Sequence, residues 1–240
     1  MNCSSVRSKT MQIKYLSTLM ALCLSFITGY SHGAPADKVA ELCGSCHALE
    51  RPDYEAQGRE ERFSRKAPPL YFAGNKYRQE WLAAFLQAPY PLYPSGYFPE
   101  SKLQDTADGD IPNENDLVTH LQLSESDASE VTDYLMNLQP YTEMLSQDNY
   151  SEGKVSLRMG TLDFRKFKGC DACHQDSEDN GGFSGPILYD AWSRLQPHYI
   201  SAFLKNPLQW DPNTIMPVPQ MNEQAVHKLV DYLKAIGETE

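Results

Sequence analysis

Four of the six cysteines stand in two copies of one five-residue pattern, Cys43-Gly44-Ser45-Cys46-His47 and Cys170-Asp171-Ala172-Cys173-His174. Two cysteines three residues apart on a helical turn can present both sulfurs to one edge of a porphyrin. The histidine that follows can then place its imidazole under the ring and reach the iron. C-x-x-C-H is the attachment signal for c-type haem. The pattern therefore predicts two covalently bound haem c groups with their iron, and His47 and His174 as proximal iron ligands.

Three other kinds of site use paired cysteines. Zinc sites built from two C-x-x-C pairs usually have the pairs about 15–20 residues apart, whereas these two patterns begin 127 residues apart. A thioredoxin-like redox pair needs strands and helices in alternation around it, and neither pattern has such surroundings. Structural disulfides are possible in an oxidising compartment, but they do not require a histidine after each pair. Haem attachment accounts for the histidines as well as the cysteines.

The first 36 residues have the order of a secretory signal peptide. Three basic residues occur there without an acidic one, a short apolar run follows, and the segment ends in Ala34-Pro35-Ala36. A basic start, an apolar middle and a small-residue cleavage site mark exported proteins. The apolar run is shorter than the about 20 residues of a spanning helix. We therefore expect residues 1–36 to be removed from a periplasmic protein without a stable membrane span; retention as an N-terminal anchor is the alternative.

The net charge of the chain limits the kinds of partner that it can bind. The 240-residue chain has 21 basic and 32 acidic residues, which gives a formal net charge of −11. Removal of the first 36 residues takes away three basic residues, so the exported chain would carry −14. Because nucleic-acid binding requires a basic surface, nucleic acid is excluded as a partner. Acidic surfaces attract basic patches, so we expect redox protein partners with basic docking surfaces.

The chain repeats itself around the two motifs. Residues 66–89 align without a gap to residues 184–207, with identity at eight of 24 positions. Each half then ends in a segment with the periodicity of an amphipathic helix. In the second half its apolar face consists of Val226, Leu229, Val230, Leu233 and Ile236. The repeat predicts that each half folds around its own motif.

Two domains of a common size follow from the repeat. We place the first at residues 37–139 and the second at residues 153–240, joined by a linker at 140–152. The first half is the longer one, because it contains a stretch rich in Pro, Tyr and acidic residues at about 90–115. Such composition indicates an inserted surface loop.

Both halves resemble the class I cytochromes c over almost all of residues 37–240. The second half carries the family's marks as Gly185-Pro186-Ile187-Leu188, Asn206-Pro207, Ile215-Met216-Pro217 and Asp231-Tyr232-Leu233. The resemblance implies an all-α fold of two tandem helical domains, each around one haem. It also implies that the backbone carbonyl of Pro186 helps to orient His174, and Pro68 holds the matching haem-binding position. The first half departs from the family where Ala67 replaces the glycine and where no methionine lies in the ligand loop.

The distal iron ligands are predicted from their loop positions. Met216 lies in a proline-rich loop just before the last helix, and a thioether is a soft, neutral ligand that raises the reduction potential. Met221 is the rival, but it falls where a packing residue is expected. In the first half His120 lies close to the position that Met216 holds in the repeat. We therefore predict His47 and His120 as ligands of the first iron, with an open distal site as the alternative, and His174 and Met216 as ligands of the second.

The expected function is electron transfer by a di-haem cytochrome that carries single electrons between redox partners, without catalytic residues. Two six-coordinate irons would leave no room for a substrate. The alternative is a haem enzyme, of the peroxidase type or one that oxidises small sulfur compounds, with a displaceable distal ligand on the first iron. A third interpretation is the cytochrome subunit of a larger oxidoreductase. Its docking surface would be the inserted loop, with Tyr90, Tyr93, Tyr97 and Phe98 as contact residues.

Overall fold

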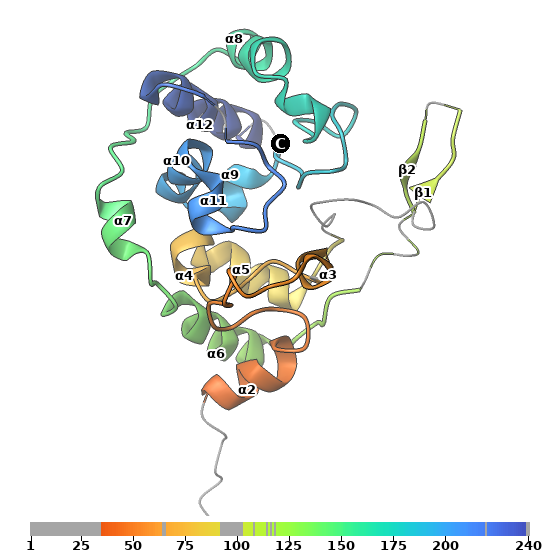
Figure 1. Ribbon diagram of the computed structural model, residues 1–240, viewed down its shortest axis with the longest axis vertical. Helices are drawn as coiled ribbons and strands as arrows, with labels where there is room; N and C mark the ends of the chain where they lie inside the picture. The colour runs from red at the N-terminus through yellow and green to blue at the C-terminus, as the bar shows by residue number, and fades with distance from the viewer. Residues whose placement is uncertain are drawn as a thin grey trace, which may run out of the picture. The chain divides into compact units, whose positions relative to one another are not determined.

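The computed structural model describes residues 35–63, 66–91, 103–107, 109–113, 115, 117, 119–218 and 220–238. The chain divides into two units, Met1–Ala34 and Pro35–Glu240, and the described residues all belong to the second. Almost all of the predicted signal peptide, residues 1–36, therefore lies outside the described residues, as do Tyr93, Tyr97 and Phe98. The described chain is mostly helical (Figure 1), in agreement with the expected all-α class. Within these ranges no helix is long and apolar enough to cross a membrane.

The first half places helices on either side of its cysteine motif. They are α2 (Pro35–Cys43), α3 (Arg59–Phe63), α4 (Ala73–Lys76), α5 (Gln79–Gln87) and α6 (Glu125–Met136). Ser124 begins α6 as its N-cap, because its hydroxyl accepts a hydrogen bond from the backbone N–H of Asp127. Within the predicted insertion, β1 (Leu103–Gln104) pairs with β2 (Ile111–Pro112) in an antiparallel hairpin. The hairpin is a feature that the composition of the loop did not predict.

The second half repeats this order. It contains α8 (Leu157–Leu162), the π-helical turn η3 (Asp163–Phe167), the 3₁₀ turn η4 (Cys170–Ala172), α9 (Ala191–Arg194), α10 (Pro197–Lys205), α11 (Pro207–Trp210) and α12 (Glu223–Gly237). The five apolar residues predicted to form one face of the last helix are all buried. That face of α12 is therefore confirmed as the side that packs into the core.

The sequence repeat is also a repeat of structure. Helices α4 and α9 each have four residues and occupy aligned positions of the repeat. Helices α5 and α10 each have nine residues and are aligned in the same way. Both longer helices end just before the shared proline, Pro89 or Pro207, because a proline lacks the N–H that would continue a helix.

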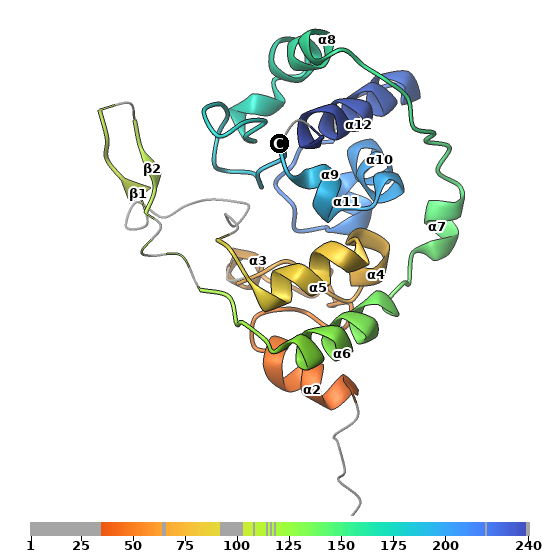
Figure 2. The same cartoon turned by 180° about the vertical axis from the view of Figure 1, so that it is seen from behind.

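Three clusters of buried side chains form the core. One belongs to the first half and includes Val39 and Leu135, and one belongs to the second half and centres on α12. The third is aromatic and takes residues from both halves, namely Tyr71, Phe72, Tyr199 and Trp210. Figures 1 and 2 show α4 and α5 next to α9, α10 and α11, where this cluster lies. The two halves therefore pack against each other through this aromatic cluster.

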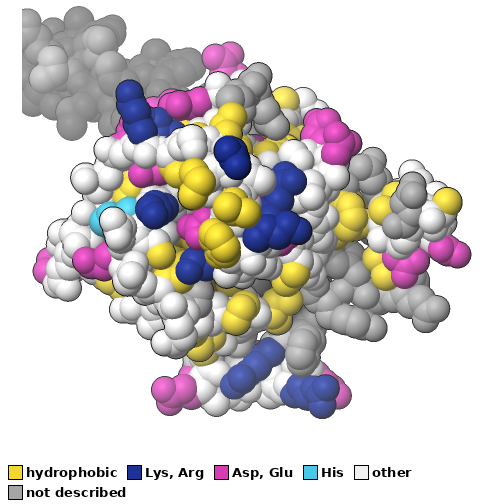
Figure 3. Space-filling model, turned by 90° about the horizontal axis from the view of Figure 1, so that it is seen from above, with side chains coloured by type: hydrophobic (Ala, Val, Ile, Leu, Met, Phe, Trp, Pro, Cys, Tyr) yellow, Lys and Arg dark blue, Asp and Glu magenta, His cyan; other side chains and the backbone are white. Residues whose placement is uncertain are grey.

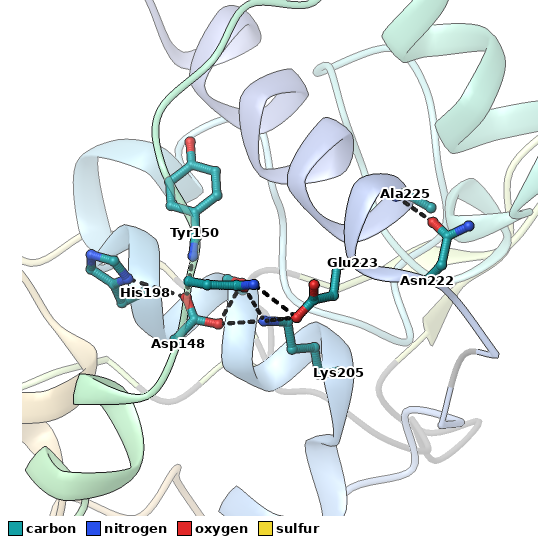
Figure 4. A network of polar contacts seen from close by, with 9 residues as sticks. Asp148, Tyr150, His198, Lys205, Asn222, Glu223 and Ala225 are labelled. Carbon is teal, nitrogen blue, oxygen red and sulfur yellow. Dashed lines mark hydrogen bonds and ion pairs between the residues drawn. The ribbon is translucent and has the colours of Figure 1, made fainter.

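The predicted linker, residues 140–152, contains the short helix α7 (Thr142–Ser146) and an anchoring aspartate. Asp148 accepts hydrogen bonds from Lys205 (2.6 Å), Ser201 (2.9 Å) and His198 (3.1 Å), all of them in α10 (Figure 4). Burial alone would raise the pKa of Asp148, but these hydrogen bonds outweigh it and hold the pKa below its ordinary value. The linker is thus tied to the second half by a buried carboxylate.

Candidate functional sites at the two C-x-x-C-H segments

Both motifs form the same tight turn. In each, the carbonyl oxygen of the first cysteine accepts hydrogen bonds from the backbone N–H groups of the second cysteine and of the histidine. The distances are 3.1 and 2.9 Å for Cys43 with Cys46 and His47, and 3.2 and 3.0 Å for Cys170 with Cys173 and His174. Because α2 ends at Cys43 and η4 begins at Cys170, each turn lies at a helical end. The turn brings both thiols and the imidazole onto one short stretch of chain.

The two motif histidines are oriented in the same way. Nδ1 of His47 lies 2.7 Å from the carbonyl oxygen of Pro68, and Nδ1 of His174 lies 2.7 Å from that of Pro186. A carbonyl can only accept a hydrogen bond, so Nδ1 must donate it and Nε2 is left with its lone pair. This is the arrangement in which backbone contacts orient metal-binding histidines. The contact from Pro186 is the one that the resemblance implies, and Pro68 makes its counterpart.

The protonation of these rings also suits metal binding. Burial lowers the pKa of both His47 and His174 below the ordinary value, and it outweighs the hydrogen bonds to Pro68 and Pro186, which act in the opposite direction. Neutral imidazole is the form that binds a metal ion. Both rings are thus in the ligating form near neutral pH.

The motif cysteines do not resemble reactive redox pairs. The cysteines that the structure describes, Cys43, Cys46, Cys170 and Cys173, are all free thiols. Burial raises the pKa of Cys43, and burial together with the nearby Asp171 raises the pKa of Cys170 to about 11. Redox-active C-x-x-C cysteines have a lowered pKa, because the thiolate is the nucleophile. The raised values count against thiol–disulfide exchange at these sites.

His120 lies opposite His47. Their ring centroids are 6.2 Å apart, with 60° between the ring planes. Nδ1 of His120 lies 2.9 Å from the carbonyl oxygen of Leu121 and so donates to it, which leaves Nε2 free in this ring as well. A metal ion about 2 Å from one nitrogen of each ring, with the rings on opposite sides, would separate the centroids by roughly 6 Å. The separation of the two rings would therefore allow one metal ion to bind both imidazoles.

Aromatic side chains of α5 pack beside His120. The edge of the Phe85 ring lies against His120, with 4.9 Å between the ring centroids, and Phe85 stacks in turn on Trp81 at 4.9 Å. Both aromatic residues belong to α5, so this helix supports the loop histidine from one side. Trp81 also donates a hydrogen bond to Tyr90, whose hydroxyl donates to Asp190. Of the four aromatic residues proposed for docking, the one that the structure describes is thus engaged within the fold.

The surroundings of the two histidines differ at one position. A Cβ atom added to Gly185 would lie 2.5 Å from Cε1 of His174, so a side chain there would strike the imidazole ring. The aligned residue of the first half is Ala67, which has a Cβ. The ring of His47 therefore cannot pack against the backbone in the same way as that of His174.

Met216 and Met221 are separated by their surroundings. Met216 is half-buried in the loop between α11 and α12, where its backbone N–H donates to the Thr214 hydroxyl at 3.2 Å. Met221 packs against the core of the second half, and Leu123 packs against that of the first, as expected for matching packing residues. Among the described residues, His47 and His120 form a ring contact, with 6.2 Å between the ring centroids.

A buried carboxylate next to the second motif was missed by sequence reasoning. Asp176 accepts a two-point ion pair from Arg165 (2.8 and 2.9 Å), and hydrogen bonds from Tyr232 (2.6 Å) and Asn180 (3.1 Å). Burial, together with the hydrogen bond to Asp176, raises the pKa of Tyr232 to about 12. The network ties the residues after His174 to η3 and α12. Its one signal in the sequence is an aspartate two residues after the motif.

The other two described histidines contact residues of the linker, 140–152. His198 bonds to Asp148, and the ring of His227 lies edge-on to Tyr150, with 5.4 Å between the centroids.

Within the part of the chain that the structure describes, no group of three or more His, Cys, Asp or Glu side chains is placed to hold a metal ion. A structural zinc site needs four such ligands, whereas a porphyrin supplies four nitrogens itself and needs axial ligands alone from the protein. Each motif by itself supplies two thiols and one imidazole, fewer than the four ligands of such a zinc site. Comparisons of the chain with protein-family models, with curated proteins and with solved structures found no match.

Proposed function

We propose that this protein is a di-haem c-type cytochrome that carries single electrons between redox partners outside the cytoplasm. The observation that supports the proposal most is the matched geometry of the two C-x-x-C-H segments. In each, the histidine donates Nδ1–H to a proline carbonyl at 2.7 Å and leaves Nε2 free beside two free thiols. Zinc binding and thiol exchange do not require this combination, whereas haem attachment uses every part of it.

The four thiols would be consumed by haem attachment. Cys43 and Cys46 would bind the first porphyrin, and Cys170 and Cys173 the second. The raised pKa of Cys43 and of Cys170 keeps these thiols protonated and slow to oxidise before attachment. The chain would then carry no reactive thiol in its described part.

The first iron would be held by two histidines. The 6.2 Å separation of the His47 and His120 ring centroids supports this assignment over an open distal site, because it is close to the roughly 6 Å expected when two imidazoles bind one metal ion. When bound, the haem supplies one-electron chemistry between ferric and ferrous iron. His47 and His120 would both bind its iron and leave no site for a substrate, which favours electron transfer over catalysis.

The second iron would be held by His174 and Met216. Met216 lies in a loop bounded by α11 and α12, and the hydrogen bond from its N–H to Thr214 restrains the loop locally. Because methionine ligation raises the potential of haem iron, the second haem would be the one on which an electron rests. Transfer would then run from the first half to the second.

The overall charge bears on the partners. A formal net charge of −11 for the full chain, or −14 without residues 1–36, favours partners whose docking surfaces are basic. Such association is sensitive to salt, because ions screen charges beyond about 10 Å at 0.1 M.

The test is production of the full chain in the periplasm of a host that matures c-type cytochromes. We expect the purified protein to carry two haems by intact mass and by pyridine haemochrome absorbance, with low-spin spectra that carbon monoxide does not change rapidly. Cys46→Ser and Cys173→Ser should each reduce the covalent haem content from two to one. A protein without covalent haem, or with two haems that survive both substitutions, would refute the proposal.

The enzyme alternative has its own readout in the same material. A five-coordinate, high-spin first haem that binds carbon monoxide at once would mean that His120 is not a ligand. Peroxide reduction assays on that material would then separate a haem enzyme from an electron carrier.

A further inference from the structure

One segment of this acidic chain has the opposite charge. Between residues 154 and 168 there are five basic residues and one acidic residue, a local net charge of +4. The basic residues are Lys154, Arg158, Arg165, Lys166 and Lys168. Arg165 is engaged by Asp176, and the other four are exposed. The segment comprises α8, η3 and the residues beside them, and we call it the α8–η3 surface.

The same segment exposes large apolar side chains. The exposed fractions are 44% for Leu157, 53% for Met159, 38% for Leu162 and 66% for Phe167. On soluble proteins, large exposed apolar surfaces often mark binding sites. The four residues lie within eleven positions of one another, between the exposed basic residues.

The packing of α8 explains why its long side chains face outward. The helix contacts α12 through Gly160, and a Cβ atom there would lie 2.2 Å from Cδ2 of Tyr232. Phe164 is buried beside the same ring, with 5.6 Å between the centroids. Gly160 and Phe164 make the close contacts with α12, and Val155 also packs against this core. The remaining large apolar residues of the segment are exposed, namely Leu157, Met159, Leu162 and Phe167.

Figure 3 views the molecule from the α8 end. On this face hydrophobic side chains lie among Lys and Arg side chains, with Asp and Glu side chains between and around them. The acidic neighbour Glu152 is paired with Lys234, so it does not offset the charge of the surface. Long apolar tips flanked by basic groups are the pattern of helices that lie in a membrane interface.

We propose that the α8–η3 surface binds the surface of a bilayer that contains anionic phospholipids. The basic residues would approach lipid phosphates, and the four apolar side chains would enter the headgroup region. A protein partner is less favoured, because protein interfaces are depleted in Lys and three of the four exposed basic residues of this surface are lysines. The exposed Phe167, Met159 and Arg158 suit both kinds of partner. The proposal does not rest on the haems.

The test is co-sedimentation of the purified full chain with vesicles. Mass spectrometry verifies that the parent and all variants begin at the same residue. One set of vesicles contains phosphatidylglycerol and phosphatidylcholine, and the other phosphatidylcholine alone. The charge variant is Lys166→Gln with Lys168→Gln, and the apolar variant is Met159→Ser with Phe167→Ser. The matched control is Leu208→Ser with Lys228→Gln, which alters one exposed apolar and one exposed basic residue elsewhere in the second half.

We expect binding to the anionic vesicles alone, weakened by salt. A lysine near an anionic membrane surface contributes about 1 kcal/mol, which is roughly a fivefold change in partitioning. The charge variant should therefore bind about 25-fold more weakly. The apolar variant should bind at least about tenfold more weakly than the parent. The control should bind as the parent does.

Four results would overturn the proposal. They are equal binding to neutral vesicles, no binding to either set, equal weakening in the control, and unchanged binding by both variants. Sedimentation velocity, without lipid, would show whether the surface instead pairs with a second copy of the chain. Retention on a polyglutamate resin in the absence of vesicle binding would assign the surface to an acidic protein.

Discussion

Tyr77 and Leu195 pair in an antiparallel bridge, although they occupy the same position in the two repeats. The flanking hydrogen bonds are also related by the repeat. The N–H of Arg78 donates to the carbonyl of Arg194, and that of Gln196 donates to the carbonyl of Lys76, each at 2.9 Å. A residue that meets its own counterpart lies on a two-fold axis. The two halves therefore meet as an isologous pair within one chain.

The Arg78 side chain is predicted to stabilise this boundary. Its Nε donates to the carbonyls of Trp192 (2.8 Å) and Leu195 (3.0 Å), and its guanidinium lies over the Trp192 ring at 5.0 Å. Arg78→Ala should reduce the free energy of unfolding by about 2 kcal/mol, the range for hydrogen bonds from charged groups. Urea unfolding measures the change. A loss no greater than that of Lys228→Ala, at an exposed position, would contradict the prediction.

Asp148 makes the stability dependent on pH. Because its pKa is lowered in the folded chain, the carboxylate stabilises the fold above the unfolded-state pKa of about 3.9. This contribution is lost as the pH falls through the lower, folded-state pKa. Asp148→Asn should therefore be less stable than the parent by about 2 kcal/mol at pH 7, and the difference should shrink in acid. Urea unfolding at pH 7 and pH 3 tests this, with the exposed Asp179→Asn as control; a difference that is independent of pH would be evidence against it.

Gly185 and Ala67 offer a matched pair of substitutions. Gly185→Ala would put a Cβ atom 2.5 Å from the His174 ring, and overpacking of this kind costs about 1–3 kcal/mol. Ala67→Gly removes a Cβ from the aligned position and should cost less than 1 kcal/mol, roughly the flexibility of glycine. We expect lower stability for Gly185→Ala and, if the second motif binds haem as proposed, a lower haem content at that site. Equal effects of the two variants would mean that the ring contact does not matter.

His120→Met tests the coordination of the first iron. If His120 is its distal ligand, the thioether should raise the lower of the two reduction potentials by on the order of 0.1–0.3 V, within the about 0.8 V that axial ligands span. His198→Met, at a histidine bonded to Asp148, should leave both potentials unchanged. Spectroelectrochemical titration provides the measurement. An unchanged low-potential component in His120→Met would remove His120 from the ligand set.

The local features of the fold were readable from the sequence. The C-x-x-C-H turns, the proline after α5 and α10, and the buried face of α12 depend on residues a few positions apart, where backbone geometry sets which side chains share a face. The repeat could be aligned for the same reason. The aligned segments of the two halves form helices of identical length, α5 and α10.

Tertiary structure decided the contacts between distant segments. The repeat predicted that His120 and His47 lie near each other, but the 6.2 Å distance between their rings depends on how the chain returns past α5 after the insertion. Asp176 became a buried anchor because Arg165 and Tyr232 converge on it from separate helical segments. The outward apolar side of α8 likewise follows from the contact of Gly160 with Tyr232, since a small residue lets the helix approach closely on that side alone. Residue types and spacing determined which groups could do chemistry, and long-range packing decided which of them meet, because such contacts depend on the whole path of the chain.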